Sequence, residues 1–329
     1  MNFFLLILVS IILFLIFYKK NHFIAEKLNL LDTVSEKKLK IHEIDTPSIG
    51  GINIYISTTF FFIFFNNNFN LLNVDILTFW LCITSLFIIG LIDDYIDLSA
   101  FKKIILYCVF TFMFFYQDHG LKIEFIFSEV LDAEIALGEN AILFSIICAV
   151  FLMNALNFLD GIDGIFLTFS LSIVLILIFI NFSVFLAFVA FNLFLLLICN
   201  INKKLFTGNS GVILIAVIIS IYCIDYSQNY PKNLSIEKVL IMFFIPAIDT
   251  TRLLVQRILN NKNPFKRDLN HIQHIFFLKV KKSIWIPSLF SFQMLIYFLT
   301  FIISPIFILV ALFLLYFYIL NKYTYEKIK

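Results

Sequence analysis

The stretch Leu71–Asp97, LLNVDILTFWLCITSLFIIGLIDDYID, is a long apolar run that ends in three closely spaced aspartates. Runs of about 17 to 25 apolar residues recur along the chain, and each can cross a hydrocarbon core of roughly 30 Å as a helix. Of the 329 residues, 61% are hydrophobic and only 14% are charged. Because this composition and the mean hydropathy of +0.99 lie outside the range of soluble globular domains, we expect an all-α polytopic membrane protein.

The apolar runs predict about eleven transmembrane helices in a single integral membrane domain over residues 1–329. We place the helices at approximately 1–18, 49–65, 71–92, 101–117, 140–158, 165–181, 183–200, 208–224, 235–258, 284–303 and 304–321. The first run lacks the basic flank and the small-residue cleavage site of a signal peptide, so we expect it to be a retained helix.

The basic residues predict the orientation of these helices. If the N-terminus lies outside, 21 of the 24 Lys and Arg residues fall on one face of the membrane, and only Lys122, Lys232 and Lys238 fall on the other. The positive-inside rule then places the C-terminus in the cytoplasm. The net charge of +2 gives no reason to expect nucleic acid as a partner.

Three carboxylates, Asp93, Asp94 and Asp97, lie at the expected cytoplasmic end of the third helix. Asp93 and Asp97 share a face if the helix continues through both. Carboxylates so close together repel one another unless a cation joins them, and their hard oxygen atoms suit Mg²⁺ or Mn²⁺. The alternative is a solvated helix end without a ligand.

The run Asn154–Gly164 ends the fifth helix and has a polar residue at every third position. These residues are Asn154, Asn157, Asp160 and Asp163, and Gly161 and Gly164 lie among them. Polar stripes in membrane helices are costly and usually face a cavity or a partner helix, while glycines let the backbone break and approach a ligand. The alternative is hydrogen bonding between helices.

Two further segments follow. Phe206–Gly211 is a short glycine-containing turn that opens an apolar helix, and its backbone amides could hold an anion or could simply form a turn.

The longest cytoplasmic loop follows Asp249 and Arg252. It places four cations beside two histidines, a plausible diphosphate clamp or an ordinary basic flank: Arg257, Lys262, Lys266, Arg267, His271 and His274.

All these polar clusters fall on the predicted cytoplasmic face. A soluble, charged, metal-bound phosphate donor would meet a lipid-embedded acceptor there, as a membrane phosphotransferase requires. The chain has no convincing internal repeat and its acids lie at one interface, which disfavours a transporter.

In their order along the chain, five motifs resemble those of the polyprenyl-phosphate N-acetylhexosamine-1-phosphate transferases of glycosyltransferase family 4, which are related to the phospho-MurNAc-pentapeptide translocases. The motifs are Lys40 and His42 with Pro47–Gly51, then Asp93–Ser99, Asn154–Gly164, Phe206–Gly211 and Asp249–His274. The resemblance implies ten or eleven helices around a cytoplasmic cleft, in the plasma (inner) membrane of a bacterium. It also implies Mg²⁺, a UDP-linked N-acetyl sugar as donor and undecaprenyl phosphate as acceptor. The products would be a lipid-diphosphate sugar and UMP, which would start a surface glycan such as an O-antigen or a capsule; a homodimer is compatible with this reading.

The resemblance also implies a role for each cluster. Catalytic roles would fall to Asp93, Asp94 and Asp97, and metal binding to Asp93, Asp94 and Asn209. The nucleotide sugar would be bound by Asn157, Asp160, Gly161, Asp163, Phe206, Arg267, His271 and His274, with Phe206 stacked on uracil and Arg267 and the histidines on the diphosphate.

This chain departs from the family pattern at three positions. The usual Gly-Asp-x-Gly contains Asn209 in place of the metal-binding aspartate, the usual His-x-His-His contains Gln273, and an arginine common after the loop aspartate is Leu269. We expect weaker metal binding, compensated by Asp97 or another carboxylate. The lack of three histidines disfavours a full peptidoglycan translocase. The alternative function is that of a catalytically weakened or inactive member that acts as a transporter or a lipid-binding protein.

Overall fold

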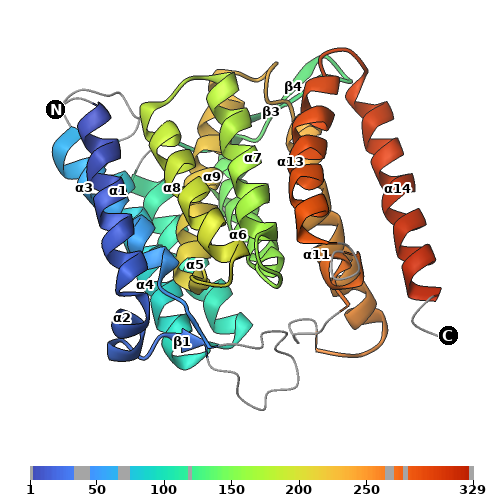
Figure 1. Ribbon diagram of the computed structural model, residues 1–329. Helices are drawn as coiled ribbons and strands as arrows, with labels where there is room; N and C mark the ends of the chain where they lie inside the picture. Colours follow the sequence, from blue (N-terminus) through green and yellow to red (C-terminus); the bar gives the residue numbers. More distant parts are fainter. Residues whose placement is uncertain are drawn as a thin grey trace.

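The computed structural model of the chain describes residues 3–32, 45–65, 75–117, 121–263, 270–276 and 281–325. It is a bundle of upright helices in which the first helix begins at the upper end and the last helix ends at the lower end (Figure 1). Each of the eleven predicted apolar runs forms helix, which confirms the all-α fold class.

The bounds of the helices match the predicted runs to within a few residues, except that the predicted run over 235–258 is broken. The short helices α2 and α12 lie outside the predicted runs. The helices are α1 (Phe3–Lys19), α2 (Asn21–Lys27), α3 (Gly50–Phe65), α4 (Ile76–Ile96), α5 (Ala100–Gln117), α6 (Ala141–Leu159), α7 (Ile165–Ile180), α8 (Val184–Ile201), α9 (Gly208–Asn229), α10 (Ile236–Met242), α11 (Phe244–Leu259), α12 (Ile272–Phe276), α13 (Lys282–Leu299) and α14 (Pro305–Tyr325), with a short 3-10 helix at Gly138–Asn140.

Six of the described helical segments are long and apolar enough to cross a membrane on their own, and the number rises to eight if each of two bent pairs is one span. The bent pairs are α1 with α2, at 71°, and α10 with α11, at 80°. The helices α3, α7 and α13 are shorter apolar helices. The chain is therefore a multi-pass membrane protein.

The predicted helix over 235–258 is broken at Phe243, which corrects the sequence-based prediction. Pro246 has no N–H to offer the carbonyl of Met242, the residue four positions earlier, so the helical hydrogen-bond ladder is interrupted there. The side-chain amide of Gln293 in α13 donates to that carbonyl instead. The break is thus stabilised by a contact from a neighbouring helix.

Two small antiparallel sheets were not predicted. One joins β1 (Leu31–Asp32) to β2 (Thr46–Pro47), and the other is a hairpin of β3 (Phe125–Ser128) and β4 (Ala133–Ala136) at the upper end of the bundle (Figure 1). The hairpin is held on α10, because both carboxylate oxygens of Glu237 accept hydrogen bonds from the turn over 128–130.

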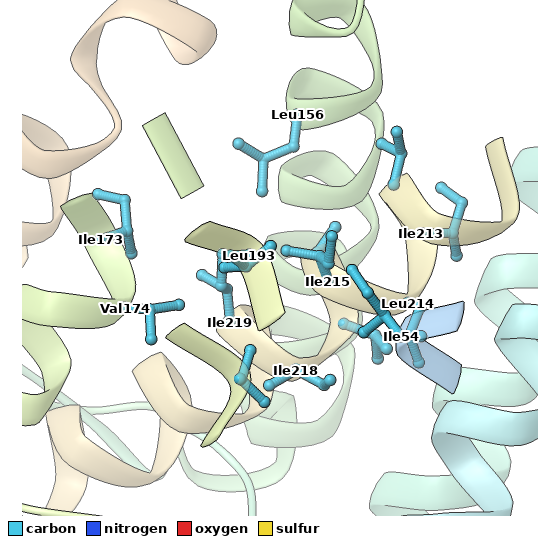
Figure 2. Packing of buried hydrophobic residues seen from close by; sticks show 14 of the residues in the cluster. Ile54, Leu156, Ile173, Val174, Leu193, Ile213, Leu214, Ile215, Ile218 and Ile219 are labelled. Atoms are coloured by element: carbon cyan, nitrogen blue, oxygen red, sulfur yellow. The ribbon is translucent and has the colours of Figure 1, made fainter. Parts of the chain in front are cut away.

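The core of the bundle is built around α9. Every residue from Ser210 to Tyr226 is buried, so this helix is apolar on all sides, as expected for a helix at the centre of a bundle. It contacts α3, α4, α6 and α7. Figure 2 shows isoleucine and leucine side chains of α9 packed among labelled residues of α3, α6, α7 and α8.

Glycines let three of these helices approach closely at the lower end. A β-carbon on Gly51 of α3 would lie 2.2 Å from the amide nitrogen of Gly211 in α9, and one on Gly90 of α4 would lie 2.6 Å from the α-carbon of Ser210. Small residues allow backbones in membrane bundles to meet in this way. The crossing brings the motifs around residues 47–51, 90–97 and 206–211 together.

We expect Gly51→Ala to destabilise the protein, because the backbone of Gly211 cannot give way without moving α9. Overpacking of this kind costs about 1–3 kcal/mol, so the thermal unfolding midpoint of the purified protein should fall. Gly138→Asn is the control, since nothing lies within 4 Å of a β-carbon there and asparagine tolerates the positive φ. Equal midpoints for the two variants would contradict the close crossing.

Candidate active site

The motifs over 47–51 and 206–211 lie side by side at the lower end of the bundle. The backbone N–H of Phe206 donates to the carbonyl of Pro47 at 2.8 Å, and those of Gly50 and Gly51 donate to the carbonyls of Phe206 and Thr207 at 2.9 and 2.8 Å. These bonds fix the entry of the chain into α9. Phe206 itself is only 9% exposed, and its stacking on uracil stays a prediction.

Asp94 caps the N-terminus of α9. Its two carboxylate oxygens accept hydrogen bonds from the backbone amides of Asn209, at 2.7 Å, and Ser210, at 3.0 Å. Amides at a helix N-terminus have no partner within the helix, and a negative charge is favourable there. The anion at this turn is therefore a carboxylate of the protein itself, supplied by α4.

Asp93 forms a buried ion pair with Lys103 of α5. One carboxylate oxygen lies 2.6 Å from the Lys103 Nζ, and the other accepts the backbone N–H of Leu98 at 2.8 Å. Both charged residues are at most 5% exposed. Asp93 thus joins the end of α4 to the start of α5. Sequence reasoning missed Lys103, because it stands beside Lys102 at the start of an apolar helix, where two lysines look like an ordinary basic flank.

Asp97 lies outside the helix that carries Asp93. The helix α4 ends at Ile96, and Asp97 follows in the left-handed conformation with φ of 48° and an exposed side chain. The expectation that Asp93 and Asp97 share a helix face is therefore wrong. The helix ends because the Asp93 carboxylate binds the amide of Leu98, in the segment that turns toward α5.

The turn between α6 and α7 carries Asp160, Gly161 and Asp163. It is fastened by Asn200 at the end of α8, whose side-chain oxygen accepts the backbone N–H of Gly164 at 2.5 Å and whose amide donates to the carbonyl of Leu205 at 3.3 Å. Asn200 is 3% exposed and was not a candidate from the sequence, where it is one asparagine near the end of an apolar run.

The carboxylate of Asp160 in this turn interacts with those of Asp94 and Asp163. Asp160 keeps an exposed side-chain surface, yet surrounding protein atoms desolvate its carboxyl group and raise its pKa well above the usual value. The negative charges of Asp94 and Asp163 raise that pKa further. Asp163 is 8% exposed, and Asn157 is half-buried. Three carboxylates from α4 and the α6–α7 turn therefore form one mutually repelling group, which a cation would relieve.

The donor set fits a hard cation. Asp94, Asp160 and Asp163 offer carboxylate oxygens, and Asn209, whose backbone N–H binds Asp94, carries a side-chain amide oxygen. Among the residues that the structure describes, no three His, Cys, Asp or Glu side chains already converge at metal-binding distance. Mg²⁺ is usually held by one or two carboxylates together with waters and substrate phosphates, so a partial protein site is what such an ion needs.

The histidine segment is anchored by Asp249 of α11. The Nδ1 atom of His271 lies 2.8 Å from one Asp249 oxygen, and Arg252 Nη2 donates to the other at 2.7 Å. The His271 ring also lies against Phe158 at the end of α6, with ring centres 5.1 Å apart. Because a carboxylate can only accept, Nδ1 of His271 carries the proton of this bond.

The helix α12 packs directly on the α6–α7 turn. Gln273 donates a side-chain hydrogen bond to the carbonyl of Phe158. A β-carbon on Gly161 would lie 2.9 Å from both Gln273 Nε2 and His274 Nε2, so these two side chains pack closely on the turn. His274 is therefore adjacent to the turn that carries Asp160 and Asp163. Lys40, His42, Lys266, Arg267 and Leu269 lie outside the described residues.

An apolar cavity of about 390 Å³ lies beside the Asp249 network. It is lined by residues of α11, α12, α13 and α14, among them Phe244, Ile272, Trp285, Leu289 and Tyr316. Tyr316 and the residue next to His271 belong both to the cavity wall and to the polar network. An apolar chain in the cavity would therefore end close to the histidine segment.

These features define a membrane-embedded helical protein with a polar, partly acidic site at one end of the bundle. Residues 76–227, from α4 to α9, match the family model described as glycosyl transferase family 4. This central part of the chain, just under half of its length, is therefore similar to that family of transferases. A segment of 98 residues is 32% identical to the phospho-N-acetylmuramoyl-pentapeptide-transferase of Prochlorococcus marinus subsp. pastoris. That segment covers 29% of this chain, and it spans only about a quarter (27%) of the relative.

We expect Lys103→Met to destabilise the protein, because it leaves the buried Asp93 carboxylate without its cation. Removing one partner of a buried ion pair costs about 3–5 kcal/mol, which a thermal unfolding measurement would register. The control is Lys102→Met, since Lys102 is the exposed neighbour. Adding Asp93→Asn to Lys103→Met should recover part of the loss. Similar unfolding midpoints for the two methionine variants would refute the ion pair.

Proposed function

We propose that this chain transfers an N-acetylhexosamine 1-phosphate from a UDP-sugar to polyprenyl phosphate and so begins the synthesis of a cell-surface glycan. The observation that carries the proposal is the meeting of two groups at the α6–α7 turn. Asp160 interacts with Asp94 on one side, and Gln273 and His274 of α12 lie against Gly161 on the other. Acidic groups suit a metal ion, and histidine with arginine suits a diphosphate.

The apolar cavity supports a lipid acceptor. Its wall is almost entirely apolar, and it lies between helices of a membrane bundle beside Arg252 and His271. A polyprenyl chain would fill such a space, because burying hydrocarbon is favourable, while its phosphate would remain at the polar border. In this assignment the end of the bundle that carries Asp94, Asp160 and Asp163 faces the cytoplasm of a bacterium. The excess of Lys and Arg residues on the same face agrees with the positive-inside rule.

The residues would divide the work as follows. Asp160, Asp163 and Asn157 would hold the nucleotide end of the donor, and His271 and His274, with Arg267, its diphosphate. Asp94 would keep the acceptor phosphate deprotonated and bind Mg²⁺ together with the side chain of Asn209. Asp93 is already bonded to Lys103, so its first contribution is to fix the position of Asp94.

The reaction would be a direct displacement. An oxygen of the acceptor phosphate forms a bond to the β-phosphorus of the donor, and the bond from that phosphorus to the bridging oxygen breaks. The electron pair stays on the departing UMP, and the product is a polyprenyl-diphosphate sugar. Bound Mg²⁺ would supply neutralisation of the charge on the transferring group and on UMP.

A second candidate is a family member that binds lipid without turnover. Asn209 favours it, because an amide in place of a carboxylate removes one negative charge from the proposed metal site. The apolar cavity would serve lipid binding equally well.

The decisive experiment is transfer of radiolabel from a panel of UDP-N-acetyl sugars to polyprenyl phosphate by the purified protein. We expect transfer that is abolished by EDTA and reduced at least about a hundredfold by Asp94→Asn or Asp163→Asn, because each removes a charge that acts on the metal and phosphates. Asp75→Asn is the control, since Asp75 caps the opposite end of α4 and asparagine keeps that cap. Failure with every donor, while the protein remains folded, would favour the lipid-binding candidate.

The variant Asn209→Asp tests the metal site itself. A carboxylate adds one negative charge beside Asp94, so the Mg²⁺ concentration that supports half-maximal transfer should fall by about tenfold. Asn202→Asp adds the same charge at an exposed position of the same end and should leave that concentration unchanged. An identical Mg²⁺ dependence in Asn209→Asp and in the unaltered protein would count against Asn209 as a ligand.

A further inference from the structure

Tyr316 of α14 is the polar member of an otherwise apolar stripe. The buried residues of this helix recur every fourth position as Ile308, Leu312, Tyr316 and Leu320, each at most 7% exposed. The three aliphatic residues Ile308, Leu312 and Leu320 pack α14 on its neighbours with apolar side chains alone. The hydroxyl of Tyr316 therefore needs a separate explanation.

That hydroxyl lies inside the network that holds His271. It donates to Asp249 Oδ1 at 2.7 Å and accepts from Arg252 Nε at 2.8 Å, so both of its hydrogen-bonding capacities are used. Arg252 Nη2 donates to the same Asp249 oxygen at 2.7 Å and to the carbonyl of Asn270 at 2.8 Å. Tyr316 thus binds both Asp249 and Arg252 of α11.

The orientation of Asp249 determines the orientation of His271. Its Oδ2 atom lies 2.8 Å from His271 Nδ1, and the amide of Ile272 points at both oxygens, at 3.2 and 3.3 Å. A carboxylate held on one oxygen by Tyr316 and Arg252 cannot rotate freely, and it selects the imidazole tautomer with the proton on Nδ1. Nε2 of His271 is then left for a ligand.

The ring of Tyr316 also lines the apolar cavity, together with Ile272, the residue after His271. One side chain therefore has its aromatic face in the cavity and its hydroxyl in the polar network. Whatever fills the cavity touches the group that fixes Asp249. This links α14, which lies outside the family-matched segment over 76–227, to the histidine end of the site.

We propose that Tyr316 is a positioning residue, which fixes His271 through Asp249 and couples the occupied cavity to the histidine. The proposal rests on the proposed function only in that His271 is taken as a diphosphate-binding group. The orientation of the His271 ring by Tyr316, through Asp249, can be tested without measuring sugar transfer.

The test compares Tyr316→Phe with Tyr318→Phe in protein labelled with ¹⁵N-histidine and reconstituted in lipid nanodiscs. Tyr318 is 63% exposed on the same helix, so its variant changes the same atoms outside the network. The chain has five histidines, and His271→Gln identifies the His271 imidazole signals. We expect a single Nδ1–H tautomer in the unaltered protein and in Tyr318→Phe, and mixed or broadened signals in Tyr316→Phe.

Asp249→Asn serves as the positive control and should give the same spectral change. Arg252→Gln removes the guanidinium group that donates to Asp249 and to Tyr316. It provides a second test in case Tyr316→Phe does not fold. In the transfer assay, Tyr316→Phe should lower kcat about tenfold, as expected for losing a hydrogen bond to charged groups. KM for polyprenyl phosphate should change little, because phenylalanine keeps the cavity wall.

The outcomes separate the two proposals. His271 signals that are unchanged in a folded Tyr316→Phe protein overturn the positioning role, whatever the transfer assay gives. If Tyr316→Phe does not fold, unchanged signals in Arg252→Gln overturn it. Changed His271 signals in a protein that transfers no sugar from any donor support the positioning role and overturn the proposed function. A change of equal size in Tyr318→Phe would also overturn the proposal, because it would reflect α14 as a whole.

Discussion

The bond between Asp94 and the first amides of α9 is the constraint on which the rest of the site depends. The helix α9 is buried from Ser210 to Tyr226, and the first amides of a helix have no partner within the helix itself. A carboxylate from α4 satisfies them. It can do so only because Gly90 lets α4 approach α9 closely, and the contact of Gly51 with Gly211 brings in α3 as well. The cap formed by Asp94 therefore depends on the close helix approach that Gly51, Gly90 and Gly211 allow.

This cap also determines what the neighbouring aspartate does. Successive residues on a helix point roughly 100° apart, so when Asp94 faces α9, Asp93 must face another helix. It meets Lys103 of α5 and the amide of Leu98. Two adjacent carboxylates therefore hold two different helices to the end of α4. The charged end of the bundle is held together largely by the same residues that give it its charge.

Much of the fold could be predicted because a membrane helix is a local property of the sequence, set by the length and polarity of one run. The break at Phe243 was visible only in Pro246, and the β3–β4 hairpin is too short to give a pattern. The polar clusters at helix ends were also local. The contacts of Asn200 with Gly164 and of Tyr316 with Asp249 join residues 36 and 67 positions apart, and each begins with a single polar residue in an apolar run. No local pattern marks such pairs.

The departures from the family pattern differ in what they can affect. Asp94 caps α9 through the backbone amide of Asn209, so the cap does not depend on which side chain stands at this position. Gln273 donates to the carbonyl of Phe158, a hydrogen bond that keeps α12 on the α6–α7 turn without any charge. Neither of these hydrogen bonds needs a charged side chain at Asn209 or Gln273. The two neutral side chains are therefore compatible with the packing of α9 and α12, and they offer less charge to a metal or a phosphate than a carboxylate or a protonated histidine would.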